Sequence, residues 1–364
     1  MFLMHNRPAD MVRRVVRADV LAMAAYTVQD AAGLLKMDAM ENPHRLPQAL
    51  QDELGRRLGS VALNRYPGPQ LEKLRTALHL HGDLPPGSAL MMGNGSDELI
   101  SLLAMACCTP GASVLAPEPG FVMYGMSARL QGLAYHGVPL RDNFELDEPA
   151  MLEAMRRLQP TIVYLACPNN PTANCWDQEV MERIIAAAPG LVVVDEAYQP
   201  FARRSFMAHL PQHANLLVMR TMSKFGLAGV RIGFLAGCRE LVAQIDKVRP
   251  PYNISTLNAE CCLFALEHAD EFALQAQDII TQRETVLRRL GAMAGLQTFR
   301  SDANMVLIRL PPGSADRVFA GMKAAGVLVK NVSGMHPLLH DCLRLTVGTG
   351  AENESMLQAL KESL

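Results

Sequence analysis

Several features that mark membrane, nucleic-acid-binding and secreted proteins are missing from this chain of 364 residues. No apolar run approaches the roughly 18 residues of a membrane-spanning helix. The N-terminus has no apolar block with a small-residue cleavage site, so we expect no signal peptide. The 34 basic and 36 acidic residues give a formal net charge of −2, whereas proteins that bind nucleic acids or membrane surfaces are usually basic. We expect neither kind of partner.

The eight cysteines and ten histidines show no spacing typical of a metal site. There is no C-x-x-C pair and no H-E-x-x-H, and eight cysteines in a chain of this length do not form a disulfide framework. We therefore expect reduced cysteines, no bound metal and a cytoplasmic location. Hydrophobic residues make up 49% of the chain, which is close to the globular average and is enough for two lobes.

The stretch between about residues 90 and 240 predicts an α/β sheet. Largely apolar runs, typical of parallel strands buried on both faces, alternate with helical segments such as residues 151–158 and 178–188. The four runs are residues 113–116, 161–167, 191–194 and 216–219. From about residue 265 the pattern changes to a helical stretch (267–290) followed by short strands at 305–310, 326–329 and 342–347. We expect a large domain over residues 41–264, a smaller α+β domain over 265–364, and an N-terminal segment, 1–40, that completes the smaller domain.

Polar side chains follow each predicted strand of the large domain. The carboxyl ends of parallel strands meet at one edge of the sheet, where ligands of open α/β folds bind. An aromatic ring, an amide, a carboxylate, hydroxyls and an amine should therefore converge there. In chain order these are Phe121, Asn170, Asp195, Tyr198, Thr221, Ser223 and Lys224.

Lys224 is one of only seven lysines, and it alone follows a strand and precedes a glycine-rich turn. A lysine with a lowered pKa can form a Schiff base with a carbonyl compound. Asp195 ends an apolar run, where a buried carboxylate needs a cationic partner such as a protonated pyridine nitrogen. Tyr198 and Asn170 can donate to a phenolate oxygen on the same ring, and Phe121 can lie flat on the ring face.

A phosphate site is predicted beside these residues. Residues 93–96, Gly-Asn-Gly-Ser, precede an apolar helix, and a glycine-rich turn at a helix N-terminus attracts an anion. Arg231, Ser223 and Thr221 would supply the remaining donors. The acidic residues Asp97 and Glu98 lie close to this site, so at least one of their side chains must point away or accept hydrogen bonds.

The order of these motifs identifies a resemblance. Asn170-Pro171-Thr172, Asp195-x-x-Tyr198, Ser223-Lys224 and Arg231 resemble the motifs of the fold type I aminotransferases, which use pyridoxal 5′-phosphate (PLP). More narrowly, the chain is similar to the histidinol-phosphate aminotransferase family from about residue 20 onward. The segments that match are residues 41–43, 65–67, 93–98, 168–172, 194–198, 223–224, 227–231 and 343–348.

The resemblance implies roles that the residues alone do not assign. Lys224 would link covalently to PLP, and Arg344 would clamp the substrate α-carboxylate. Ser96 and Asp97 would bind the PLP phosphate through backbone N–H groups. Tyr66 would reach the PLP phosphate of a partner subunit, so the active unit would be a homodimer. Two further positions would lie near the substrate: Tyr26 and Lys330.

The chain departs from the family pattern at four positions. Phe121 stands where relatives often have tyrosine, which keeps stacking but loses a hydroxyl. Ala173 replaces the usual glycine after Asn-Pro-Thr, so we expect this turn to avoid a φ that only glycine tolerates. Gly350 and Lys330 stand where relatives often have arginine, which affects the substrate-phosphate contacts more than the PLP site.

The function implied is transamination between L-histidinol phosphate and 2-oxoglutarate in histidine biosynthesis. Two alternatives keep the PLP chemistry but change the substrate: an aromatic aminotransferase and a phosphothreonine decarboxylase of the same fold. A third is a PLP-sensing regulator without catalysis. It is disfavoured because the residues before Glu41 are too few for a DNA-binding domain.

Overall fold

The computed structural model describes residues 8–25 and 29–364. Residues up to Gly33 form a unit separate from Leu34–Leu364, and each is described by itself. The first unit contains two short helices, α1 (Pro8–Val15) and α2 (Ala18–Leu21), in which no residue is buried. Tyr26, predicted to lie near the substrate, is outside the described residues. In the described part of the chain, no helix is long and apolar enough to cross a membrane.

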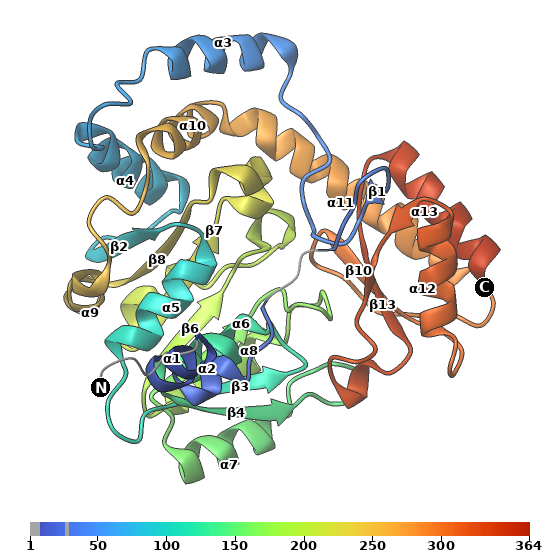
Figure 1. The fold of residues 1–364 in the computed structure, drawn as a ribbon, viewed down its shortest axis with the longest axis horizontal. Helices are drawn as coiled ribbons and strands as arrows, with labels where there is room; N and C mark the ends of the chain where they lie inside the picture. Colours follow the sequence, from blue (N-terminus) through green and yellow to red (C-terminus); the bar gives the residue numbers. More distant parts are fainter. Residues whose placement is uncertain (1–7, 26–28) are drawn as a thin grey trace, which may run out of the picture. The chain divides into compact units, whose positions relative to one another are not determined.

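A seven-stranded sheet forms the centre of the second unit (Figure 1). Its neighbouring strands are parallel except at β8, which runs antiparallel to both of its neighbours. In spatial order the strands are β2 (Ser88–Gly93), β8 (Gly233–Cys238), β7 (Leu216–Thr221), β6 (Leu191–Asp195), β5 (Ile162–Ala166), β3 (Ser113–Glu118) and β4 (Ala134–Pro139). Four of them, β3, β5, β6 and β7, confirm the strands predicted from apolar runs.

Helices cover both faces of this sheet. Alternate residues of β6 show the two-sided burial: Val192 and Val194 pack in one core cluster and Val193 in another. The first cluster includes residues of α4 (Pro69–His81), α7 (Glu148–Leu158), α8 (Gln178–Ala187) and α10 (Thr256–Glu267). The second includes residues of α5 (Ser96–Ala106), α6 (Met123–Gln131) and α9 (Arg239–Ile245). Helix α3 (Gln48–Gly59) packs on α10 and has no buried residue.

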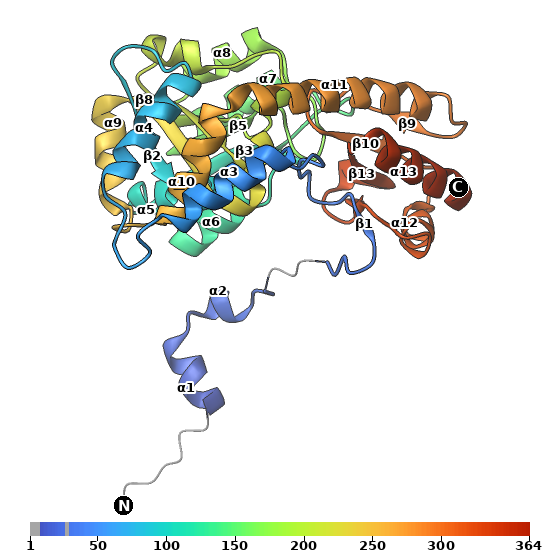
Figure 2. The ribbon, with the colours of Figure 1, turned by 90° about the horizontal axis from the view of Figure 1, so that it is seen from above.

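A smaller antiparallel sheet with its own core lies in the C-terminal part of the chain. Its strands, in spatial order, are β12 (Lys330–Asn331), β13 (Cys342–Thr346), β10 (Met305–Arg309) and β9 (Gln297–Thr298). Helices α11 (Ala269–Gly291), α12 (Ala315–Ala324) and α13 (Gly350–Ser363) accompany it, and α11 runs toward it in Figure 2. Strand β1 (Leu35–Lys36) pairs in parallel with β11 (Val327–Leu328). The α/β class with a mostly parallel central sheet is confirmed.

The helical stretch predicted over residues 267–290 differs from the structure at its start. Glu267 ends α10, and α11 begins at Ala269. His268 separates the two helices because its backbone (φ −113°, ψ 34°) is not helical. The domain boundaries at residues 40 and 264 stay a prediction.

Candidate active site

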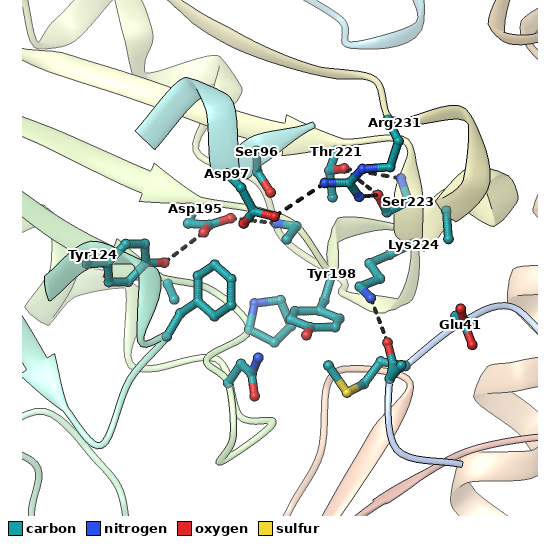
Figure 3. Close-up of a pocket in the computed structure, with 18 of the residues that line it drawn as sticks. Glu41, Ser96, Asp97, Tyr124, Asp195, Tyr198, Thr221, Ser223, Lys224 and Arg231 are labelled. Atoms are coloured by element: carbon teal, nitrogen blue, oxygen red, sulfur yellow. Dashed lines mark hydrogen bonds and ion pairs between the residues drawn. The ribbon is translucent and has the colours of Figure 1, made fainter. Parts of the chain in front are cut away.

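The carboxyl ends of the central strands open on a cavity of about 340 Å³ (Figure 3). That volume lies within the range of small-molecule sites. Ten of the predicted cofactor-binding residues line it together: Ser96, Asp97, Phe121, Asn170, Asp195, Tyr198, Thr221, Ser223, Lys224 and Arg231. The convergence expected from the strand ends therefore exists, although the individual roles stay predictions.

One end of the cavity has the donors of an anion site. Helix α5 begins at Ser96, so its unpaired backbone N–H groups and its positive dipole end lie there. Gly95 precedes it at φ +86°, and a Cβ at this position would stand 2.8 Å from Arg231 Nη2. Glycine is required here by both the backbone conformation and the close approach of the guanidinium.

Hydroxyl groups and the guanidinium of Arg231 complete this end. Arg231 Nη1 donates to Ser223 Oγ at 3.4 Å, and Thr221 Oγ1 donates to the same oxygen at 3.0 Å. Asp97 does not oppose an anion as its charge alone suggests, because its carboxylate accepts from Arg231 Nη2 at 3.3 Å. These groups, namely the N-terminus of α5, Thr221, Ser223 and Arg231, form a phosphate cradle that fits a phosphate monoester.

The opposite end holds a buried carboxylate. Asp195, 5% exposed, accepts from the Tyr124 hydroxyl at 2.7 Å and from the Ala197 N–H at 3.0 Å. Burial raises the pKa of Asp195 to about 6, while these two hydrogen bonds act in the opposite direction. Relative to 3.8, this shift corresponds to about 3 kcal/mol that the ionised group costs at neutral pH. A cationic ligand group against this carboxylate would offset that cost.

Lys224 projects into the cavity from the turn Ser223–Leu227 (η3), which follows β7 and contains the non-helical Gly226. Burial lowers the pKa of Lys224 to about 8, and the positive charge of Arg344 contributes. At pH 7 about one molecule in ten then carries a neutral amine, against fewer than about one in a thousand at the ordinary pKa. The amine Nζ donates to the carbonyl of Ala39 at 2.9 Å. A nucleophilic amine is therefore available at neutral pH.

Arg344, on β13, contacts the side chain of Asn170. Its Nη1 donates to Asn170 Oδ1 and its Nη2 to the Asp38 carbonyl, both at 2.6 Å. Asn170 lines the cavity, whereas Arg344 is not one of the described residues that line it. Lys330, on the neighbouring strand, pairs in register with Arg344, so both side chains are on one face of the small sheet.

Tyr66 is not brought to the cavity of its own chain. It lies between α3 and α4, 77% exposed, and stacks on Tyr252 with the ring centroids 4.4 Å apart.

Among the described residues, two polar side chains that line the cavity were not predicted from the sequence. Tyr124, one turn after Phe121, supplies the hydroxyl that Asp195 accepts. Glu41 contributes a carboxylate near Lys224 and forms an ion pair with Lys36 at 2.7 Å. Glu41 lies in a segment that matches the family, and Tyr124 lies at the start of α6, where its ring meets that of Phe121 at 5.6 Å between centroids.

The expectation for Ala173 is wrong. This turn does not avoid the left-handed region, since Ala173 has φ +67°. Its N–H donates to Asn169 O and its carbonyl accepts from Asp302 N, both at 2.8 Å. These bonds hold a conformation that costs a non-glycine residue about 1 kcal/mol.

Comparison with known proteins agrees with this geometry. Residues 32–360 match the family model described as aminotransferase class I and II. The chain belongs to this family. It is 62% identical to a histidinol-phosphate aminotransferase of Methylibium petroleiphilum over 97% of this chain and 95% of the relative, and so it falls among the histidinol-phosphate aminotransferases.

Two solved structures share the fold of this aminotransferase. One is the histidinol-phosphate aminotransferase from Sinorhizobium meliloti in complex with pyridoxal-5′-phosphate, with TM-score 0.84, 23% identity, and coverage of 96% of this chain and 97% of that one. The other is an L-threonine-O-3-phosphate decarboxylase from Porphyromonas gingivalis, with TM-score 0.74, 20% identity, and coverage of 90% and 98%. The same fold thus serves two reactions, and the substrate must be argued from the site.

Proposed function

We propose that this protein is a PLP-dependent aminotransferase that acts on L-histidinol phosphate and 2-oxoglutarate and yields imidazole acetol phosphate and L-glutamate in histidine biosynthesis. The observation that carries the proposal is one cavity lined by an amine with lowered pKa, a buried carboxylate and a phosphate cradle. The 62% identity to a protein named histidinol-phosphate aminotransferase supports L-histidinol phosphate as a substrate.

The residues present fit PLP at both of its ends. The N-terminus of α5, Thr221, Ser223 and Arg231 would hold the phosphate, and Asp195 would face the ring nitrogen. Phe121 would lie against the ring, and Tyr198 and Asn170 would donate to its oxygen. When bound, PLP supplies an electron sink for the carbanion at the substrate Cα.

The protein's own groups would handle the proton and the orientation of the substrate. Lys224 Nζ, neutral when it acts, would take the proton from the substrate Cα. Arg344 would orient the α-carboxylate of glutamate by a bidentate contact, so that the Cα–H bond is the one broken. Asp195, ionised against a cation, would keep the ring nitrogen protonated.

L-histidinol phosphate differs from glutamate in its anionic group. It has no carboxylate, and its phosphate carries nearly two negative charges at neutral pH. Lys330 and Arg344 share one face of the small sheet, so together they offer two cations to this phosphate. We therefore assign Lys330 to the phosphorylated substrate. Tyr26 is kept as a substrate contact on the family resemblance.

We also propose a homodimer in which Tyr66 completes the partner's phosphate site, and a cytoplasmic location. The dimer is supported by the exposed Tyr66–Tyr252 stack, which offers apolar area outside the cavity of its own chain. Eight free cysteines are compatible with a reducing compartment. Light scattering should give twice the chain mass, and mixing inactive Lys224→Ala and Tyr66→Ala chains should restore turnover. A monomer with full activity would contradict the shared site.

The substrate is tested by a panel of single-turnover reactions. PLP-loaded protein is mixed with L-histidinol phosphate, phenylalanine, tyrosine or L-threonine phosphate while the visible absorbance of the cofactor is followed. The proposal predicts that L-histidinol phosphate reacts with a kcat/KM at least about tenfold above the others. A preference for an aromatic amino acid, or release of CO2 from L-threonine phosphate, would support the alternatives instead.

A further inference from the structure

A buried ion pair lies one residue away from both ends of the proposed cofactor site. The β6–β7 ladder ends where Asp195 pairs with Met219, and the Glu196 N–H donates to the Met219 carbonyl at 2.8 Å. Glu196 directly follows Asp195, and Arg220 directly precedes Thr221. Successive side chains of a strand point to opposite faces. Asp195 and Thr221 line the cavity, whereas Glu196 and Arg220 pair beside it.

Both members of the pair make further hydrogen bonds. Arg220 Nε donates to Glu196 Oε2 at 2.9 Å, and Arg220 Nη2 donates to Ser205 Oγ at 2.7 Å. Ser205 Oγ donates in turn to the same carboxylate at 2.9 Å, and the Phe206 N–H donates to its other oxygen. The side chain of Glu196 is 1% exposed and that of Arg220 is 11% exposed. Charges this deep are tolerated because both oxygens of Glu196 and two nitrogens of Arg220 have hydrogen-bond partners.

We propose that the Glu196–Arg220 ion pair is a positioning device that fixes the distance between Asp195 and Thr221, and so the span between the carboxylate and the phosphate cradle. This inference rests on the proposed function, since it concerns a ligand held at both ends. Thr221 leads directly to Ser223 and Lys224, and its hydroxyl belongs to the cradle. A shift of β7 against β6 would therefore move the cradle and the amine relative to Asp195.

The location of the pair favours this role over general stabilisation. It joins the two strands at the point where their backbone ladder stops, and at that point the strands carry the groups for the two ends of one rigid ligand. The aromatic side chains of Phe225 and Phe234 lie beside the pair, and Phe225, next to Lys224, packs edge-on against His81. A ligand that spans both ends gains affinity from their correct spacing, whereas a ligand at one end does not.

The test compares a ligand that reaches both ends with one that reaches a single end. Full-length chain stripped of PLP is titrated with PLP and, separately, with inorganic phosphate, for the wild type and for Glu196→Gln. The amide removes the negative charge at constant size, and because its two positions face donors from Arg220 and Phe206, its NH2 group opposes one of them. We expect the Kd for PLP to rise at least about tenfold while the Kd for phosphate changes less than about twofold.

The matched control is Glu260→Gln. Glu260 pairs with Arg57 between α3 and α10, away from the cavity, and is also mostly buried. It should lower the thermal midpoint but leave both Kd values unchanged. Arg220→Lys, which keeps the charge but loses the two-pronged contact, provides a milder variant if Glu196→Gln does not fold. It should show the same selective loss of PLP affinity, by a smaller factor.

Two results for Glu196→Gln would overturn the inference. One is an equal rise of the Kd for PLP and the Kd for phosphate, which would indicate a general loss of structure in the site. The other is an unchanged Kd for PLP. Failure of the wild type to bind PLP would contradict the proposed function itself, and is read from the first titration.

Discussion

Two stacked tyrosines allow the hydrogen bond to Asp195 to be measured with a built-in control. Tyr124 and Tyr164 are both buried, and their rings stack with centroids 4.2 Å apart. The Tyr124 hydroxyl donates to Asp195 at 2.7 Å, whereas the Tyr164 hydroxyl has no hydrogen-bond partner within the described residues. Phenylalanine at either position removes one buried oxygen and keeps the ring. The two variants therefore differ in the hydrogen bond alone.

A hydrogen bond to a charged group contributes about 2 kcal/mol. Tyr124→Phe should lower the free energy of unfolding of the PLP-free protein by about that amount at pH 8.5. Tyr164→Phe should leave it within about 0.5 kcal/mol or raise it, since an unpaired buried hydroxyl is removed. Urea unfolding with an unchanged m value is the assay.

The loss should depend on pH with a defined sign. Burial raises the pKa of Asp195 to about 6, and loss of the donor should raise it by about a further 1.5 units. The carboxylate is ionised in both proteins at pH 8.5, so the penalty is complete there. At pH 5.5 it is protonated in both, so most of the penalty should vanish. Equal losses in the two variants, or a loss of the same size at both pH values, would refute this account of Asp195.

Three further predictions follow from single contacts. Ala173→Gly should raise the free energy of unfolding by about 0.5 kcal/mol, measured by urea unfolding, because glycine relieves φ +67°; a loss of stability would mean that the methyl group matters more. The rate at which PLP-free protein captures PLP should rise with pH around a midpoint of about 8, since the neutral amine of Lys224 is required, and a midpoint near 10.5 would contradict its burial. Arg344→Gln should raise the KM for glutamate about 100-fold, whereas Lys330→Gln should raise chiefly the KM for L-histidinol phosphate. Steady-state kinetics with both amino donors tests this. An equal effect of Lys330→Gln on the two KM values would remove Lys330 from the substrate-phosphate site.

The strands that sequence patterns predicted are those buried on both faces. Residues 191–195 are apolar up to the final aspartate because helices cover both sides of β6. Of the central strands that were not predicted, β4 and β8 contain glycine or proline, although β8 is buried. β4 is an edge strand with mixed exposure that contains Gly137 and Pro139, and β8 contains Gly233 and Gly237. Glycine and proline are typical of turns, so sequence pattern alone argues against both strands.

The cavity was predictable because parallel strands share one edge, which brings Asp195 and Lys224 together without knowledge of distant contacts. The Tyr124–Asp195 bond joins residues 71 positions apart and depends on how α6 packs. Arg344 contacts Asn170 across 174 positions, and it was assigned by family resemblance alone. Ala173 shows a further limit, since a local hydrogen bond to Asn169 and a tertiary one from Asp302 override its backbone preference.

The most direct test of the central claim is the visible spectrum of the purified protein loaded with PLP, recorded before and after addition of L-histidinol phosphate and then of 2-oxoglutarate. The account predicts that the absorbance band of bound PLP is replaced by that of the aminated cofactor, and that it returns with 2-oxoglutarate. Lys224→Ala should show neither the band of covalently held PLP nor the change. A wild-type band that ignores L-histidinol phosphate would contradict the proposed substrate, and the absence of any band would contradict the cofactor.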